Sequence, residues 1–271
     1  LANKGDGESD KNFGCYTPEN TREYIKDRFS EKILRKLFVL NYAPNSMWCY
    51  FVSVYYLHNR TEEGELDEDA FYEFLDKCIA FIWTYAVISP GVNMLRTPLF
   101  AEMVNIVNNV AVTFSNYQFD IALVKNVFEN FAFNNNRPIT KAILTWWALQ
   151  DDEQKLPSLE TIFEIEHIYA RGREDKEPSL TDSRNLEAIG NKALLEKRIN
   201  IRASDYRFED KKKYYTGYVN KRNQQKSGTN IVELTTLAKT NSDFTETDIT
   251  SRTAKIIQAF IQYIVDNHLS K

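Results

Sequence analysis

His167 is the one of the three histidines in the chain whose neighbours could take part in chemistry. It directly follows Glu166, and Asn191 and Asn200 lie downstream. A histidine is a suitable base near neutral pH, and carboxylate and carbonyl oxygens are the ligands that Mg²⁺ prefers. A histidine taken alone is more often a core or surface residue than a catalytic one, so these residues matter only if the fold brings them together.

Two short runs near His167 have the pattern of β-strands. Residues 162–169 largely alternate apolar and polar side chains, which is the strand period. A polar loop over residues 171–184 follows, and Gly190-Asn191 is a turn signal before a second apolar run over residues 192–196. We therefore expect a two-stranded hairpin with a long connection. Because neighbouring strand residues face opposite sides, Glu166 and His167 point apart unless the strand ends there.

The rest of the chain has the spacing of α-helices. Aromatic residues make up 13%, whereas Gly and Pro number only 9 and 7, a balance that favours well-packed helices. His58 near one helix end and His268 in the last helical turn are interpreted as structural. A helix start is expected at Thr17-Pro18-Glu19, with its helix ending before Pro44. Further helices are predicted over residues 46–57, 67–88, 98–112, 119–133, 140–151, 208–218, 230–239 and 247–268.

Composition excludes several classes of protein. The longest apolar stretch, residues 78–95, is interrupted by Pro90-Gly91, so no membrane span is expected. The three cysteines form no CxxC pair, which excludes a disulfide framework or a thiolate zinc site and favours a cytoplasmic location. The chain begins at Leu1 without an initiator Met, and we expect a fragment of a longer protein.

Net charge divides the chain into unlike parts. The total of −4 argues against a nucleic-acid binder, but residues 1–165 carry −8, residues 166–226 carry +5 and residues 227–271 carry −1. The basic excess thus coincides with the candidate strands and the Lys-rich helix. Local charge matters more for binding a polyanion than the average does.

The spacing of the motifs in this basic part resembles the HNH, or His-Me finger, nucleases. More closely, residues 161–218 resemble the C-terminal HNH-type domain of the GmrSD family of modification-dependent restriction enzymes. The motifs that carry the resemblance are Glu166-His167-Ile168, Asn185-Leu186, Gly190-Asn191 followed by Leu194-Leu195, Asn200, Phe208, Lys211 to Lys213 and Tyr214-Tyr215. The helix that contains Arg252 also fits the end of the family pattern.

The resemblance implies roles for four residues of these motifs. His167 would be the general base, Glu166 and Asn200 would hold one divalent metal, Mg²⁺ or alternatively Mn²⁺, and Asn191 would hold the histidine ring or the loop backbone. Metal and base fit the chemistry, since hydrolysis of a phosphodiester needs a deprotonated water and neutralisation of the leaving oxygen. The residues expected to contact nucleic acid are Arg171, Arg173, Lys192, Lys211, Lys212 and Lys213.

Each assignment has a structural alternative. Glu166 could be a solvated strand carboxylate, Asn191 an ordinary turn residue and Asn200 a helix N-cap. Lys211 to Lys213 could form a solvated helix face. Two positions depart from the family pattern: Ala170 replaces its proline, and Lys192 replaces the leucine of Gly-Asn-Leu.

The resulting prediction is a mainly α fold, in which a helical array precedes a small ββα-metal α+β domain with C-terminal helices. Its parts are a flexible lead-in over residues 1–16, a helical domain over 17–152 and an HNH-like domain over 153–271. The predicted function is a metal-dependent endonuclease that cleaves DNA in restriction or phage defence, with RNA not excluded. The resemblance also implies a nucleotide-dependent, ParB-like domain upstream on the same full-length chain. The alternative is a non-catalytic helical module that binds nucleic acid or a protein through a degenerate HNH fold.

Overall fold

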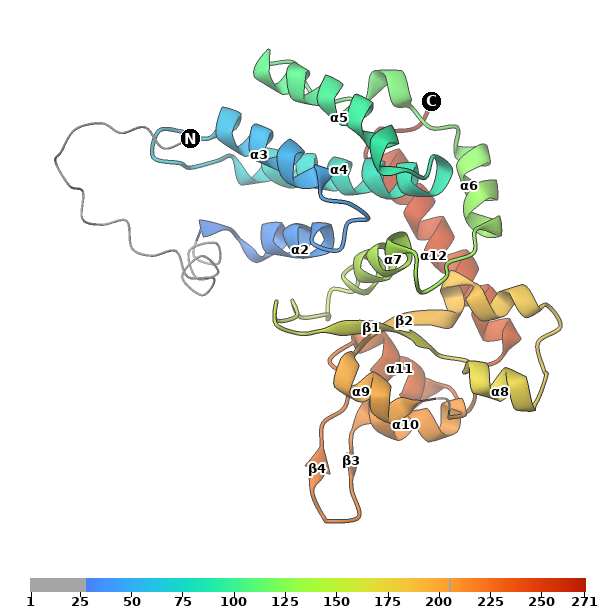
Figure 1. Cartoon of the computed structure of the whole chain (residues 1–271). Coiled ribbons are helices and arrows are strands. Elements are labelled where there is room, and N and C mark those ends of the chain that lie inside the picture. Colours follow the sequence, from blue (N-terminus) through green and yellow to red (C-terminus); the bar gives the residue numbers. More distant parts are fainter. Residues whose placement is uncertain (1–27, 205) are drawn as a thin grey trace.

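The computed structural model describes residues 28–204 and 206–271, and Figure 1 shows how their elements are arranged. The described part is mainly helical, as predicted, with two small two-stranded sheets. The lead-in over residues 1–16 and the helix start at Thr17 lie outside the described residues. No helix within the described ranges has the length and apolar character that crossing a membrane requires.

The first half of the described chain is an array of helices whose ends largely match the sequence signals. The side chain of Asp67 caps the longest of them by accepting hydrogen bonds from the backbone N–H groups of Asp69 and Ala70, each 3.0 Å long. Pro138 occupies the first position of another, where its missing N–H costs nothing. The helices are α2 (Glu31–Leu40), α3 (Met47–Asn59), α4 (Glu68–Ile88), α5 (Val92–Val107), α6 (Ile121–Asn130) and α7 (Pro138–Ala148), with a 3₁₀ turn at Ser115–Tyr117.

Helix α5 differs from its prediction over residues 98–112. It begins at Val92, directly after Gly91, and it contains Pro98 in its interior. The buried side chains of Leu95 and Leu99 lie on either side of the proline in the sequence. Packing of these leucines favours a helix through Pro98 although proline removes one backbone hydrogen bond, and this is why the predicted start was wrong.

The second half contains the strands and shorter helices. Strand β1 (Phe163–His167) and strand β2 (Lys192–Glu196) fall where the alternation placed them. The connection between them, expected to be a loop, includes a short helix, α8 (Arg171–Lys176), and 3₁₀ turns at Ser183–Glu187 and Ile189–Asn191. The remaining elements are α9 (Lys197–Ala203), α10 (Phe208–Thr216), β3 (Tyr218–Val219), β4 (Gln225–Lys226), α11 (Val232–Thr240) and α12 (Glu246–Asp266).

Strands β1 and β2 pair antiparallel, with His167 opposite Lys192 and Glu166 opposite Ala193. Helix α9 follows β2 without a loop, and its first backbone N–H donates to the carbonyl of Ile162, just before β1. This hydrogen bond continues the ladder next to the pair of Phe163 and Glu196, and α9 contacts both strands. The result is a strand–strand–helix unit whose strand β1 carries Glu166 and His167 and whose helix carries Asn200.

A single cluster of buried apolar side chains runs through both halves. In the helical array, the ring of Phe81 stacks on that of Phe114 with centroids 3.7 Å apart. Helix α12 joins the halves, because Phe260 contacts Trp146 edge-on at 4.9 Å and stacks on Phe128 at 5.3 Å. Figure 1 shows this long helix, in red, running from beside α6 and α7 down towards the second half of the chain. Strand β1 and its surroundings are therefore packed onto the array.

Candidate active site

Glu166 lies in a buried ionic cluster on one side of β1. Its carboxylate accepts a 2.8 Å hydrogen bond from the ammonium of Lys211 and another from the hydroxyl of Tyr215, and both residues belong to α10. Glu166 and Lys211 are 3% and 1% exposed. Burial and the charge of Glu166 raise the pKa of Tyr215 well above its ordinary value. The solvated carboxylate that the alternative interpretation expected is therefore not found.

His167 lies in a second cluster. Its ring is 11% exposed, and Nε2 lies 3.5 Å from a carboxylate oxygen of Glu187. Nε2 is buried and makes no hydrogen bond within the described part of the chain. Burial lowers the pKa of His167 to about 3, and the cations of Lys192 and Arg171 add to the shift. The imidazole is therefore neutral at physiological pH.

Glu187 is the acidic residue at the centre of the His167 cluster, and sequence reasoning did not identify it. Its carboxylate accepts a 2.6 Å hydrogen bond from the ammonium of Lys192 and another from the guanidinium of Arg171. Although burial raises the pKa of Glu187, these two cations lower it overall. The ammonium of Lys192 also donates to Asn135 at 2.6 Å. No sequence motif marks Glu187, because its partners are set by the fold.

Asn191 fixes the backbone immediately after β1. Its side chain is fully buried; Oδ1 accepts a 2.7 Å hydrogen bond from the N–H of Tyr169, and Nδ2 donates to the carbonyls of Tyr169 and Leu186. Of the two roles that the resemblance implied, these contacts correspond to holding the loop backbone. They fix the chain two residues beyond His167.

Arg252 of α12 holds the turn that contains Asn191. Its guanidinium donates to the carbonyls of Gly190 and Lys192 at 2.9 and 2.7 Å, and it forms a 2.7 Å ion pair with Glu233. Thr253 accepts a hydrogen bond from the N–H of Gly190. The last helix of the chain thus positions the start of β2.

Asn200 lies in the middle of α9, and its Nδ2 donates a 3.0 Å hydrogen bond to Glu164. The helix begins at Lys197 with Glu196 as its N-cap, so the interpretation of Asn200 as a cap was wrong. Lys197 also lies 3.4 Å from the Glu164 carboxylate. Glu164 shares the strand face of Glu166 because it lies two residues earlier on β1. The period of the strand is a signal that could have identified it.

The cations expected to contact nucleic acid have diverse surroundings. Lys192 and Lys211 are buried against Glu187 and Glu166, so neither ammonium faces solvent in this structure. Arg173 makes a two-pronged ion pair with Asp243, and Lys212 donates to the carbonyl of Asn241. Arg171 is half exposed, and Lys213 is exposed with its ammonium 5.1 Å from the ring of Tyr214. For Lys211 and Arg173 the acidic partner is distant in the sequence, whereas Glu187 lies only five residues before Lys192.

The two predicted metal ligands have separate partners. The Glu166 carboxylate is bound by an ammonium and a hydroxyl, whereas the Asn200 amide is bound by Glu164. Within the described ranges, no three His, Cys, Asp or Glu side chains are grouped as a metal ion would require. Mg²⁺ needs a near-octahedral set of oxygen ligands, and a buried carboxylate already neutralised by Lys211 does not fit that need.

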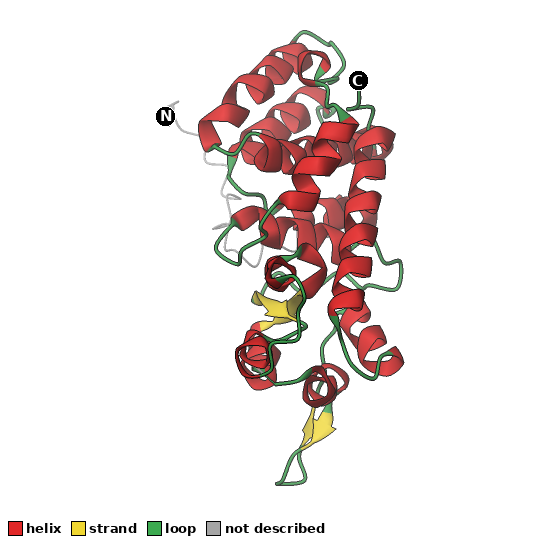
Figure 2. Cartoon of the chain, turned by 90° about the vertical axis from the view of Figure 1, so that its right-hand side faces the viewer, coloured by secondary structure: helices red, strands yellow, loops and turns green. Residues whose placement is uncertain are grey.

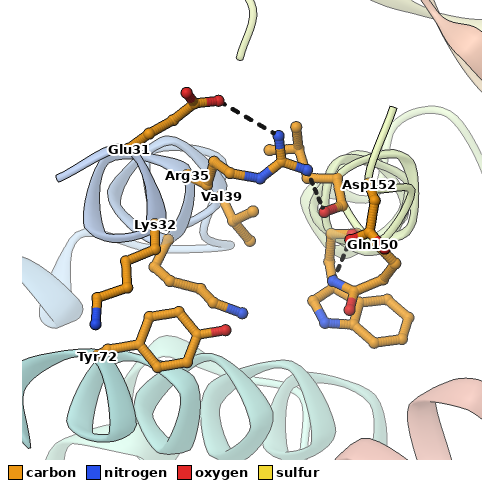
Figure 3. A pocket seen from close by; sticks show the side chains of 10 residues that line it. Glu31, Lys32, Arg35, Val39, Tyr72, Gln150 and Asp152 are labelled. Atoms are coloured by element: carbon orange, nitrogen blue, oxygen red, sulfur yellow. Dashed lines mark hydrogen bonds and ion pairs between the residues drawn. The ribbon is translucent and has the colours of Figure 1, made fainter. Parts of the chain in front are cut away.

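Two of the hollows in the described part of the chain border the helical array at different places. Glu187 lines one of about 350 Å³, which lies between residues 128–133 and residues 182–189. Figure 3 shows another of about 380 Å³, whose lining comes from α2, α4, α7 and the residues that follow α7. There Arg35 donates to the carbonyls of Leu149 and Asp151. The first hollow is the one that adjoins the His167 cluster.

Comparison of the amino-acid sequence with known proteins places the chain in a family. The family model described as GmrSD restriction endonucleases, C-terminal domain, matches residues 120–259. No curated protein and no solved structure gives a significant match. The matched range starts within the predicted helical domain and contains every predicted site residue. Because it covers more than half of the chain, the protein belongs to the GmrSD restriction endonucleases by way of their C-terminal domain.

Proposed function

We propose that this chain is an HNH-type endonuclease domain that hydrolyses phosphodiester bonds of DNA in restriction of foreign or modified DNA, as a form of phage defence. The observation that carries the proposal is the strand–strand–helix unit, in which His167 ends β1 and Asn200 lies on the helix that follows β2. This is the arrangement that the resemblance predicts for a ββα finger, and it lies inside the matched range.

The neutral imidazole of His167 is the proposed proton acceptor. In the proposed step it takes a proton from water, the water oxygen bonds to phosphorus, and the bond to the leaving 3′-oxygen breaks. The leaving oxygen then takes a proton from solvent. A base with a pKa of about 3 is weak, but an arriving phosphate anion favours the imidazolium and raises that pKa towards the working pH.

Arg171 is the proposed contact for the phosphate beside His167. Its side chain is half exposed, and Glu187 occupies part of its guanidinium. A guanidinium has five N–H donors, so a phosphate can bind those that face solvent. No part of the step is assigned to the predicted Mg²⁺ or Mn²⁺, because Lys211 already neutralises Glu166. Metal dependence stays a prediction that the assay addresses directly.

Nicking of supercoiled plasmid DNA tests the proposal. We expect the His167→Ala variant to lose cleavage by roughly 10²- to 10⁴-fold, the usual contribution of a general base. His58→Ala is the matched control, since this histidine is exposed on the helical array. Parallel reactions contain Mg²⁺, Mn²⁺ or EDTA, and an RNA substrate separates DNA from RNA cleavage. Equal cleavage by wild type and His167→Ala would show that the mechanism is wrong.

A non-catalytic nucleic-acid-binding module is the second candidate. The observation that favours it is the ammonium of Lys211 on Glu166, where the resemblance implied a metal ion. This candidate predicts salt-sensitive DNA binding without cleavage under any of the ion conditions. In either case, we propose that the choice of target depends on the ParB-like domain that the resemblance implies.

A further inference from the structure

A hairpin formed by β3 and β4 projects from the body of the protein (Figures 1 and 2). Between Gly217 and Gly228 the sequence carries Lys221, Arg222 and Lys226 and no acidic residue. Lys221 and Arg222 are exposed at the tip, and Lys226 is partly exposed. The projection is therefore a local concentration of positive charge.

The base of the hairpin is fixed to the rest of the fold. Gly217 adopts a φ of +89°, and a Cβ at Gly228 would lie 2.2 Å from the carbonyl of Tyr215, so both positions require glycine. The N–H of Thr229 donates to that same carbonyl at 2.9 Å. Glu196, the last residue of β2, accepts a 2.8 Å hydrogen bond from the N–H of Asn230. The hairpin is thus held against α10 and the end of β2.

The tip of the hairpin is also held in one shape. The side-chain oxygen of Asn220 accepts hydrogen bonds from the N–H groups of Arg222 and Gln224 at 2.9 and 3.0 Å. Asn223 adopts a left-handed φ of +55° and donates to the carbonyl of Asn220. These contacts present Lys221 and Arg222 outwards.

Packing against the core does not explain why the β3–β4 hairpin is ordered. Val219 is 60% exposed, and a two-stranded hairpin is at best marginally stable by itself. The specific turn and base contacts nevertheless order the segment. A role in binding accounts for an ordered, exposed element better than a role in stability does.

The hairpin cations differ from the other cations of the basic part. Most of those have acidic partners; the pairs are Lys192 and Arg171 with Glu187, Lys211 with Glu166, Arg173 with Asp243, Arg184 with Asp182, Lys197 with Glu164 and Arg207 with Glu177. Among residues 28–204 and 206–271, no carboxylate forms an ion pair with Lys221, Arg222 or Lys226. A polyanion can bind these three without breaking an existing pair.

We propose that the β3–β4 hairpin is a binding element for duplex DNA, and that Lys221, Arg222 and Lys226 contact its backbone phosphates. This inference rests on the proposed function and identifies a surface for its substrate. The major groove of DNA admits a two-stranded ribbon, and phosphate contacts would set the position of the protein on the duplex. Aromatic contacts join Tyr218 at the hairpin base to Tyr214 and Tyr206.

Fluorescence anisotropy of a labelled DNA duplex, titrated in EDTA over a series of NaCl concentrations, tests this proposal without cleavage. The test variant combines Lys221→Gln, Arg222→Gln and Lys226→Gln. The control combines Arg60→Gln, Arg96→Gln and Lys125→Gln, which removes the same charge from exposed positions on the helical array. We expect the test variant to bind on the order of tenfold to a hundredfold more weakly at 0.1 M salt, with a salt slope reduced by about 2 to 3.

A charge-preserving variant, Lys221→Arg with Arg222→Lys and Lys226→Arg, should bind like wild type if phosphate contact is the cause. The proposal is overturned if the test variant binds like wild type, if the control weakens equally, or if polyglutamate competes as well as duplex DNA. Preference for a single-stranded oligonucleotide overturns it as well. Because catalysis plays no part in this assay, a failed plasmid-nicking experiment is a separate result.

Discussion

The helical array and the part around β1 bury different kinds of side chain. Among the described residues between α2 and α7, Glu102 is the one charged residue whose side chain is buried. Around β1 and β2 the structure describes four buried charged side chains, those of Glu166, Lys192, Lys211 and Arg252. Glu102 is satisfied by backbone N–H groups, including a 2.7 Å hydrogen bond from Phe114. The array relies on stacked aromatic rings such as Phe81 and Phe114.

Each buried charge around β1 has a partner of opposite charge. Lys211 pairs with Glu166, Lys192 with Glu187 and Arg252 with Glu233. Replacing a buried ion pair by apolar side chains is often neutral or stabilising, so such pairs are weak evidence of a stability function. We interpret this difference as support for the site proposed around β1.

Lys211→Met should give one of the two largest losses of stability. The substitution leaves the carboxylate of Glu166 buried without its cation, which typically costs about 3–5 kcal/mol. Urea denaturation measures the change. The double variant Lys211→Met with Glu166→Gln is the control: it should recover part of the loss, and equal stability of single and double variants would contradict a role for the pair.

The same variant sharpens the prediction of a metal ion. A divalent ion could replace the positive charge lost at Glu166, so Mn²⁺ should raise the melting temperature of Lys211→Met more than that of wild type. Thermal denaturation with and without Mn²⁺ measures the difference. An equal response of the two proteins would mean that Glu166 does not bind the ion.

Phe81→Ala should produce a comparable loss in the array by a different mechanism. Removing a fully buried ring that stacks on Phe114 leaves a cavity and typically costs about 3–5 kcal/mol. The loss should not depend on pH or on metal ions, in contrast to variants around β1. Urea denaturation at two pH values checks this, and a strong pH dependence would weaken the contrast between the regions.

His167→Ala should change how stability depends on pH. The folded-state pKa of about 3 lies below the ordinary value of about 6.5, so the folded wild type binds fewer protons than the unfolded chain between these pH values. Wild-type stability therefore falls as the pH drops through that window. Relative to wild type, the variant should gain about 2 kcal/mol between pH 7.5 and pH 5. Urea denaturation of both proteins at the two pH values measures this. The same difference in unfolding free energy at pH 7.5 and at pH 5 would contradict the prediction.

Lys197→Gln should have the smallest effect. Lys197 is half exposed, and its ammonium lies 3.4 Å from Glu164, a geometry in which an ion pair contributes about 1 kcal/mol or less. Urea denaturation at low and high salt measures it. A loss as large as that of Lys211→Met would show that exposure does not separate the two pairs.

Local pattern predicted most of the elements, and the missed ones are explained by packing in one case and by short length in another. Alternation located β1 and β2, and the helix predicted over residues 67–88, with its acidic first turn, matches α4, whose N-cap is Asp67. The interior of α5 through Pro98 was missed because buried leucines outweigh the local penalty. Strands β3 and β4 have two residues each, which is too short for a periodic signal.

The sequence predicted the strand and the turn that carry the site residues. It did not predict which charged side chains pair with them. The two-residue period correctly separated Glu166 and His167 onto different faces of β1, where they lie in different clusters. The burial of Lys192 and Lys211 was not predicted, since no local pattern shows that the fold brings a carboxylate to either lysine. Glu187 was missed for the same reason. The proposed catalytic roles stay predictions.

The contacts of Arg252 have a consequence for the order of events during synthesis. This residue follows Ile189 by 63 positions, yet its guanidinium fixes the carbonyls at the start of β2. A domain generally folds as a unit, and its N-terminal part leaves the ribosome before its C-terminal part. The turn beside His167 therefore acquires its final support only after α12 has emerged, and a nascent chain stopped before Arg252 would carry an unfinished site. Such timing would keep the proposed site incomplete until α12 has been translated.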